Sequence, residues 1–308
     1  MDQLVVGVVG PTATGKSDLA IALALRLGGE VVGADASQLY RGMDIGTAKV
    51  PPEERHGIAH HQLDVLEVTE EASVAAYQKA ARADVDAVLA RRAVPVVAGG
   101  SGLYVRAALD RLEIPPTDPE VRAALQERLD REGVGPLLAE LRAVDPAAAD
   151  AIEPNNGRRV VRALEVVALT GAPFSATMPT REFVRPTVLV GLRTDRWELD
   201  ARIDRRARGM FDAGLVEETR ALVGLGLREG RTASRAVGYA QALALLDGTA
   251  TLEEAVADTA LRTRRLVRRQ ESWFGADPRV AWFDPFASPW DDLVDRVVEH
   301  VTHNGPHG

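Results

Sequence analysis

Short apolar runs alternate with longer amphipathic stretches through the first third of the chain. Three runs, Leu4–Val9, Glu30–Ala34 and Val94–Ala98, are too short for helices, and each ends at a glycine or an acid. They predict strands of a parallel sheet that are buried on both faces. Between them, Ser17–Leu27 and Ala72–Arg92 carry apolar residues at helical spacing. This alternation predicts an α/β fold with a doubly wound parallel sheet, in which sites form at the carboxyl ends of the strands.

The pattern changes after about Leu112. A breaker cluster, Ile114–Pro119, is followed by a region with helical periodicity and no strand pattern. Its predicted helices are Glu120–Glu132, Val134–Val144 and Arg158–Thr170. A buried-type strand returns at Thr187–Leu192. We therefore expect an all-helical domain inserted into the α/β core.

The expected boundaries divide the chain into three parts. Residues 1–112 form the first part of the core, 113–185 the helical insertion, and 186–308 the completion of the core. After the strand at Thr187–Leu192, the periodicity predicts only helices, followed by a tail that packs back on the core. The helices are expected at Arg196–Val223, Ala233–Leu246 and Leu252–Phe274.

The first strand leads directly into a glycine-bounded loop, Gly10-Pro11-Thr12-Ala13-Thr14-Gly15-Lys16-Ser17. This loop matches the P-loop pattern G-x-x-x-x-G-K-[ST]. Gly10 and Gly15 allow a tight turn, so backbone N–H groups converge on phosphate oxygens, and the helix N-terminus adds its positive end. Lys16 supplies a charge, and the Ser17 hydroxyl is placed to coordinate Mg²⁺. The alternative, a chance glycine turn with an exposed lysine, explains neither the strand before nor the helix after.

The positions of the acids favour group transfer over hydrolysis. An ATP-driven motor or switch normally has a second carboxylate for Mg²⁺ after a later strand, but Val94–Ala98 is followed by Gly99-Gly100. The acid follows the second strand instead, at Asp35. There it can accept a proton from a nucleophile that attacks the bound ligand. A helix N-cap or loop-stabilising role for Asp35 fits the spacing nearly as well.

Arginines gather in three places although the net charge is −8. Five stand between Arg262 and Arg269, on one half of a predicted helix. The other two groups are Arg158, Arg159 and Arg162, and Arg202, Arg205, Arg206 and Arg208. Together they predict a track for a phosphate backbone. Each group alone also fits a solvated helix face with acidic partners.

Other features limit the possible functions. The chain has no cysteine, which excludes disulfides, thiolate metal sites and a cysteine nucleophile. No run is long enough to cross a membrane, and the first strand begins so early that we expect no leader peptide and a cytoplasmic protein. A metal site from His60, His61 and Asp64 is conceivable, but adjacent histidines on a strand point to opposite faces, so a structural polar loop is the preferred interpretation.

Blocks along nearly the whole chain resemble the bacterial tRNA dimethylallyltransferases, also called tRNA isopentenyltransferases. The blocks are Gly10–Ser17, Asp35–Lys49, His60–Asp64, Gly99–Tyr104, Asn155–Val166, Val237–Tyr239 and Arg269–Phe274. The P-loop alone is shared with many functions, whereas Asp35–Lys49 together with Arg162–Glu165 is close to diagnostic. Departures are mild: Ser17 and Ser101 stand where the family more often has threonine.

The resemblance implies transfer of the dimethylallyl group from dimethylallyl diphosphate to N6 of adenosine 37 in tRNA, with release of pyrophosphate. The whole P-loop, Gly10 to Ser17, would hold the diphosphate, with Mg²⁺ on Ser17 and with Arg235 as a further ligand. Asp35 would act as the general base on N6, and Thr12 and Lys16 would lie at the diphosphate.

The resemblance also implies a set of tRNA contacts. The insertion would clamp the anticodon stem-loop, and Ser37 and Gln38 would position the flipped base. The implied contacts are Asp35, Ala36, Ser37, Gln38, Ser101, Arg122, Arg158, Arg159, Val160, Val161 and Arg162. We expect a monomer that acts without a membrane.

Two other functions compete with this interpretation. A small-molecule kinase would use the P-loop for ATP and Asp35 to activate an acceptor hydroxyl, but it has no use for a polyanion track. A non-enzymatic RNA-binding protein would not need Lys16, Ser17 and Asp35 together.

Overall fold

The computed structural model describes residues 3–177 and 181–305 of the chain. It divides into two compact units. The core unit comprises Met1–Leu109 and Phe183–Gly308, and the helical unit comprises Asp110–Glu182. The sequence predicted an insertion over 113–185, and the helical unit begins and ends slightly earlier than that range.

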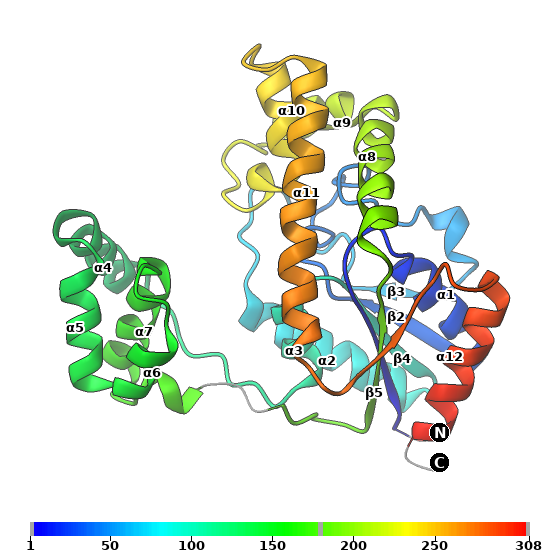
Figure 1. Ribbon diagram of the computed structural model, residues 1–308, viewed down its shortest axis with the longest axis horizontal. Coiled ribbons are helices and arrows are strands. Elements are labelled where there is room, and N and C mark those ends of the chain that lie inside the picture. The colour runs from blue at the N-terminus through cyan, green and yellow to red at the C-terminus, as the bar shows by residue number, and fades with distance from the viewer. Residues whose placement is uncertain (1–2, 178–180, 306–308) are drawn as a thin grey trace. The chain divides into compact units, whose positions relative to one another are not determined.

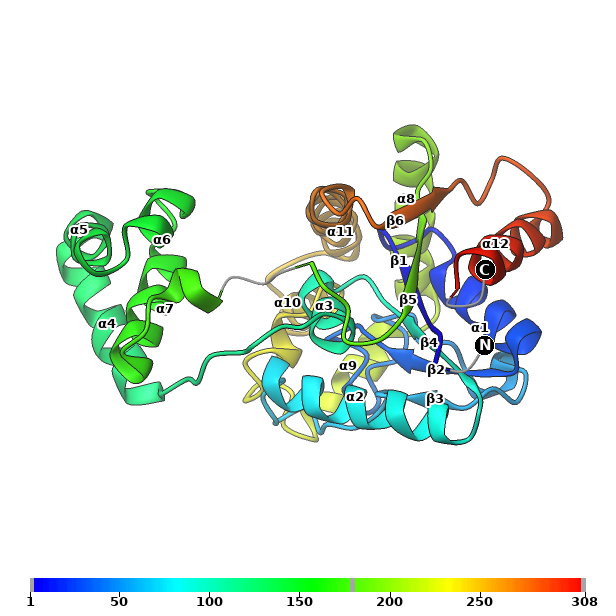
Figure 2. The same cartoon turned by 90° about the horizontal axis from the view of Figure 1, so that it is seen from below.

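The core unit contains a six-stranded sheet in which all the paired strands are parallel (Figures 1 and 2). Its strands are β1 (Val5–Val9), β2 (Gly29–Gly33), β3 (His60–His61), β4 (Val94–Ala98), β5 (Thr187–Leu192) and β6 (Val280–Phe283). Their order across the sheet is β3-β2-β4-β1-β5-β6. The predicted doubly wound α/β fold is therefore confirmed.

The two edge strands were missed from sequence. β3 has only two residues, which is too short to show an alternating pattern. β6 lies in the region that the periodicity assigned to helices and a packed tail. It pairs with β5 alone, and three of its four side chains are only half-buried. Its short Val-Ala-Trp-Phe sequence therefore lacks the long apolar run of a central strand.

Helices cover both faces of the sheet. Those of the core unit are α1 (Lys16–Leu27), α2 (Val74–Ala90), α3 (Gly102–Leu109), α8 (Arg196–Asp212), α9 (Leu215–Val223), α10 (Tyr239–Leu246), α11 (Leu252–Gly275) and α12 (Trp290–Asn304), with 3₁₀ turns at Pro52–Arg55 and Ala233–Arg235. Helices α1 and α12 share one apolar cluster with the inner strands, to which Leu19, Val8 and Leu293 contribute. The single helix predicted over Arg196–Val223 is broken, because Gly214 adopts a left-handed φ of +99° and caps α9.

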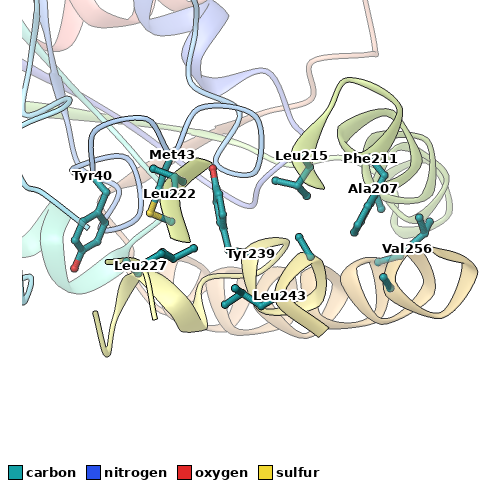
Figure 3. Close-up of a cluster of buried hydrophobic side chains, with 14 of the residues drawn as sticks. Tyr40, Met43, Ala207, Phe211, Leu215, Leu222, Leu227, Tyr239, Leu243 and Val256 are labelled. Carbon is teal, nitrogen blue, oxygen red and sulfur yellow. The ribbon is translucent and has the colours of Figure 1, made fainter. Parts of the chain in front are cut away.

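A second apolar cluster joins the polar loop after β2 to helices α8–α11 (Figure 3). Tyr40 and Met43 from that loop are fully buried with Leu215 and Tyr239. In Figure 1 helices α8–α11 extend beyond the carboxyl ends of the strands. The cluster thus fixes this loop beside the edge of the sheet where ligands bind in α/β proteins.

The helical unit has its own small core. Its elements are α4 (Pro119–Glu132), α5 (Val134–Val144), α6 (Pro146–Ala151), α7 (Gly157–Thr170) and the 3₁₀ turn Phe174–Thr177. Asp118, Asp145 and Asn156 cap α4, α6 and α7 by accepting backbone N–H bonds. Leu137 and Leu141 are fully buried inside the unit. In the part of the chain that the structure describes, no helix combines the length and apolar character needed to cross a bilayer.

Candidate active site

The loop after β1 is already shaped as a phosphate cradle. Gly10 has φ +131°, and a Cβ there would lie 2.3 Å from the Leu192 carbonyl oxygen, so glycine is required. Gly15 is left-handed and opens α1 without any side-chain cap. The carbonyl oxygen of Pro11 accepts hydrogen bonds from Thr14 Oγ1 at 2.9 Å and from Lys16 Nζ at 2.6 Å. These two bonds hold the turn while the N–H groups at the start of α1 stay available for an anion.

A cleft of about 750 Å³ opens over this cradle within the core unit. It brings together residues from three strand ends: the P-loop after β1, the loop after β2 and the glycine turn after β4. The predicted site residues that line it are Thr12, Ala13, Gly15, Lys16, Ser17, Asp35, Ser37, Gln38 and Ser101. Gly10, Pro11, Thr14 and Ala36 belong to the same loops but are absent from the lining.

Asp35 combines a local hydrogen bond with a position on the cleft. Its Oδ1 accepts from the Ser37 N–H at 3.0 Å, as expected for a loop-stabilising residue. Asp35 also lines the cleft together with Lys16, and its charge partly opposes the lowering of the Lys16 pKa by burial. No other hydrogen bond to the Asp35 carboxylate occurs among residues 3–177 and 181–305. The two interpretations of Asp35 from sequence are therefore compatible, because one oxygen orders the loop and the other is available.

Side chains of helices α9 and α10 hold the rest of the loop after β2 in place. The Tyr239 hydroxyl donates to Glu218 Oε1 and accepts from the Gly46 N–H at 3.2 Å. Glu218 Oε2 accepts from the Ile45 N–H at 2.9 Å. At the other end of the loop, Gln38 Nε2 donates to the Thr47 carbonyl at 3.1 Å. These bonds hold the polar stretch around the cleft as an ordered wall.

Three cations surround the cradle. The pKa of Lys16 is lowered to about 8, because burial and the nearby charge of Arg206 together outweigh the opposing effect of Asp35. Burial also lowers the pKa of Arg206, while Asp35 and Asp18 act in the opposite direction. Arg202 Nε donates to the Ala13 carbonyl at 3.0 Å, and its guanidinium lies 4.4 Å from the centre of the Phe286 ring. Such a concentration of positive charge in a half-closed cleft fits a highly charged anion.

The structure places three arginines of α8 beside the P-loop, a position that the sequence did not specify. The cluster on α8 was assigned to a track for a phosphate backbone, but Arg202, Arg205 and Arg206 line the cleft beside the P-loop. Helical spacing puts Arg202 and Arg206 one turn apart on the same face. The sequence could not tell which way that face points, because the orientation depends on the packing of Ile203 and Ala207 in the apolar cluster.

Gln270 is a site residue that the sequence analysis did not single out. Its side chain, only 6% exposed, spans two strand ends: Oε1 accepts from the Thr12 N–H at 2.9 Å, and Nε2 donates to the Gly100 carbonyl at 3.0 Å. A Cβ at Gly100 would lie 2.3 Å from that Nε2. The oxygen and the nitrogen of the Gln270 amide thus each have a hydrogen-bond partner, and the side chain links the P-loop to the turn after β4.

Comparison with known proteins now identifies the family. The family model described as IPP transferase matches residues 38–277. A tRNA dimethylallyltransferase from Streptomyces avermitilis is 58% identical over 294 residues, covering 96% of this chain and 94% of the relative. One from Nocardia farcinica is 60% identical over 280 residues, covering 91% and 90%. The chain belongs to the IPP transferase family.

Solved structures agree with the family. The tRNA isopentenylpyrophosphate transferase of Bacillus halodurans has a TM-score of 0.72 and 38% identity, and the match covers 99% of this chain and 97% of that one. A eukaryotic dimethylallyltransferase acting on tRNA has a TM-score of 0.83 at 24% identity, over 98% and 79% of the two chains, and shares the fold.

Within this IPP transferase, Arg235 does not reach the cleft. The sequence predicted it as a further ligand of pyrophosphate. The structure puts Arg235 on a separate cavity beside α10 and α11, together with Gln241, Asp258 and Arg262. Arg235 ends the 3₁₀ turn Ala233–Arg235. Val237, two residues later, lines the cleft, whereas Arg235 does not.

The predicted RNA contacts in the helical unit fall into three groups. Arg122 and Arg162 both bind the fully buried Glu165, at 2.6 and 2.8 Å, and Arg162 also donates to the Pro115 and Pro116 carbonyls. Arg158 and Arg159 are exposed and have no ion pair within the described residues. Val160 and Val161 are buried in the core of the unit. Their side chains pack inside the unit and are not available to an RNA surface.

Contacts within the protein also account for His61 and Asp64 of the conceivable metal site and for two of the five arginines of α11. His61 Nε2 contacts Glu30 at 2.7 Å, and Asp64 pairs with the buried Lys49. Among the described residues, no cluster of three or more His, Asp or Glu side chains is placed to hold a metal ion. On α11, two arginines pair with acids: Arg262 with Asp258, and Arg264 with Asp204. The other three, Arg265, Arg268 and Arg269, are exposed without such partners in the described chain.

Proposed function

We propose that this enzyme transfers the dimethylallyl group of dimethylallyl diphosphate to N6 of adenosine 37 in tRNA and releases pyrophosphate. The observation that carries the proposal is the cleft in which the P-loop, three arginines of α8 and the strand-end carboxylate of Asp35 converge. The names of the relatives support the same reaction. The turn after β4, Gly99-Gly100, also lacks the acid that nucleotide hydrolysis normally uses.

The chemistry follows from where charge develops. As the allylic C–O bond breaks, its electron pair goes to the diphosphate oxygen. The N–H groups at the start of α1 together with Lys16, Arg202 and Arg206 stabilise that developing charge. The N6 lone pair forms the new C–N bond, and N6 then loses a proton to the available oxygen of Asp35. The products are the prenylated adenosine, pyrophosphate and a protonated carboxyl group.

The Ser17 hydroxyl is the proposed protein ligand of Mg²⁺. Ser17 lies in the first turn of α1, is exposed and lines the cleft next to Asp18, so oxygen donors of the type that Mg²⁺ prefers are present. Bound there, the ion would neutralise part of the charge on the departing diphosphate. The remaining binding energy comes from the backbone and the cations of the cradle.

The acceptor adenine must leave its stack to enter the cleft, as targets of base-modifying enzymes do. We propose that Ser37, Gln38 and Ser101 line its position, since they lie on the same wall as Asp35. Ser101 Oγ accepts from the Ala36 N–H at 3.3 Å and so supports that wall. We further propose that the helical unit binds the anticodon stem-loop through exposed cations such as Arg158 and Arg159.

One pair of assays tests the function. Unmodified tRNA is incubated with radiolabelled dimethylallyl diphosphate and, separately, with γ-labelled ATP. We expect label in tRNA from the prenyl donor only, and loss of that label when adenosine 37 is replaced by guanosine. Transfer from ATP to an acceptor without transfer from the prenyl donor would establish the kinase instead.

A further inference from the structure

Three tryptophans of the core unit expose much of their surface, Trp197 at 78%, Trp273 at 45% and Trp290 at 37%. Trp197 stands in the first turn of α8 and does not line the cleft. Trp273 stands near the end of α11, one helical turn after Gln270, which does line the cleft. Trp273 itself does not line the cleft, but its exposed indole lies one helical turn from a residue that does.

The indole of Trp273 packs against the backbone at the start of α3. A Cβ on Gly102 would lie 2.2, 2.2 and 2.6 Å from three consecutive atoms of the five-membered ring, Cδ1, Nε1 and Cε2. Three such similar distances put the missing side chain over the face of the ring and not off its edge. The indole therefore packs one face on the bare backbone of Gly102, at the start of α3. Gly102 directly follows Ser101, on the cleft wall.

The surroundings of the indole are both apolar and positive. Leu103, the next residue of α3, is 43% exposed. On α11, Arg269 lies one helical turn before Trp273, is exposed and has no ion pair in the described chain, and the exposed Arg265 and Arg268 lie farther along or around the same helix. An aromatic face combined with unpaired arginines is the combination that binds unstacked nucleotides, because the ring stacks on the base and the cations attract the backbone.

We propose that Trp273 is a stacking platform for a nucleobase of the tRNA that lies next to the adenosine in the cleft. The inference rests on the proposed function, since it assumes that the adenosine is flipped out of its stack. Flipping removes one stacking partner from each neighbouring base. The free face of Trp273 replaces that partner for one neighbour and thereby keeps the loop open around the cleft.

Binding of an anticodon stem-loop RNA to Trp273→Ala, measured at one fixed salt concentration, tests the platform. Loss of one base–aromatic stack should weaken affinity by about 5- to 150-fold. Trp273→Phe should recover most of it, and Trp197→Ala, the matched control at an exposed tryptophan, should leave it within twofold. Gly102→Ala, which displaces the indole, should act like Trp273→Ala. Pyrophosphate affinity should be unchanged in all four variants.

A double-mutant cycle identifies the base. Stem-loops with an abasic nucleotide on either side of position 37 are bound to wild type and to Trp273→Ala. At one of the two positions the penalty of the alanine variant should disappear. Equal RNA affinity of wild type and Trp273→Ala would overturn the platform while prenyl transfer by the wild type upheld the proposed function. A changed oligomeric state of Trp273→Ala without a change in RNA affinity would instead assign the surface to a second copy of the chain.

Discussion

The arginines of α8 and those of the helical unit look alike in sequence and have different roles in the structure. Arg202 and Arg206 lie on the cleft beside the P-loop, and neither forms an ion pair with an acid among the described residues. Arg122 and Arg162 instead enclose the buried carboxylate of Glu165. The first pair is therefore available to a ligand, and the second pair holds a loop to a helix.

The buried Glu165 explains the difference. Its Oε1 accepts from the Asp118 N–H at 2.9 Å, and its Oε2 is shared by the two arginines. Their ion pairs hold the pKa of Glu165 below its usual range in spite of its burial. These two guanidinium groups are thus held in place by a carboxylate of the protein itself. Clusters of arginine predict an anion, but the anion can be part of the protein itself.

The largest expected effect in the cleft follows removal of its carboxylate. Asp35→Asn keeps an acceptor for the Ser37 N–H but removes the base, so turnover should fall by about 10²- to 10⁴-fold. Affinity for tRNA should stay close to that of wild type, because the loop keeps its hydrogen bond. Single-turnover rates and a binding titration measure the two effects. Near-normal turnover would make Asp35 a structural residue, and a parallel loss of binding and turnover would assign it to tRNA binding.

A matched pair of substitutions tests the contrast between the two sets of arginines. Arg206→Gln should reduce turnover and pyrophosphate affinity by about tenfold or more, with little change in unfolding, because a charge-assisted contact to the anion is lost. Arg162→Gln should leave pyrophosphate affinity unchanged and destabilise the helical unit by about 1–3 kcal/mol, since it removes hydrogen bonds to a buried charge. Denaturant titrations and inhibition by pyrophosphate distinguish them. Loss of stability without loss of pyrophosphate affinity in Arg206→Gln, together with loss of pyrophosphate affinity in Arg162→Gln, would show that the two pairs of arginines do not have these separate roles.

These cases also mark how far the sequence predicts the site. Gly10 to Ser17 could be recognised because the loop needs glycine and lysine at fixed spacing, whatever surrounds it. Asp35 could be placed because it ends a predicted strand. Gln270 could not, since its role depends on two backbone groups that are 258 and 170 residues away. The directions of Arg202 and Arg235 likewise depend on packing between helices that no local pattern specifies.

Some elements of the fold could likewise be predicted from the sequence and others could not. The inner strands were predictable because burial on both faces leaves a continuous apolar run, as in Val5–Val9. The edge strand Val280–Phe283 was not, because it is half-buried. The helical insertion followed from the absence of any strand pattern between two buried strands, whereas the short helix Pro146–Ala151 is a single capped turn and a half with little periodicity to detect.

Lys16 gives the cleft a pH dependence with two opposite signs. Its folded pKa of about 8 lies below the value of 10.5 for an exposed lysine, so between these pH values the unfolded chain binds more protons. The contribution of this group to stability without ligand should therefore rise from pH 8 to 10.5. Pyrophosphate needs the charged form, so its affinity should fall over the same range, by about tenfold for each pH unit above 8.

The control for this prediction is Lys16→Met, which lacks the titrating group. Its pyrophosphate affinity should be low at pH 7 and should lose the fall above pH 8 that Lys16 causes, whatever the ionisation of pyrophosphate itself contributes. Calorimetric titrations of both proteins from pH 7 to 10 give the difference. Parallel pH profiles would remove Lys16 from the phosphate site.

The smallest effect is expected at the exposed arginines of the helical unit. It separates arginines available to RNA from arginines that hold a carboxylate of the protein within one helix. Arg158 and Arg159 begin the helix whose next turn holds Arg162 on Glu165, so one helix carries both kinds of arginine. If the first two contact tRNA phosphates, changing both to glutamine weakens binding of every tRNA alike and reduces the slope of log affinity against log salt by about 1.4–1.8. Arg162→Gln should leave that slope unchanged, because the Arg162 guanidinium is held by Glu165, Pro115 and Pro116 and is only 23% exposed. An unchanged slope in the double variant would show that RNA does not bind this face and would leave the arginines of α11 as the cations available to the tRNA backbone.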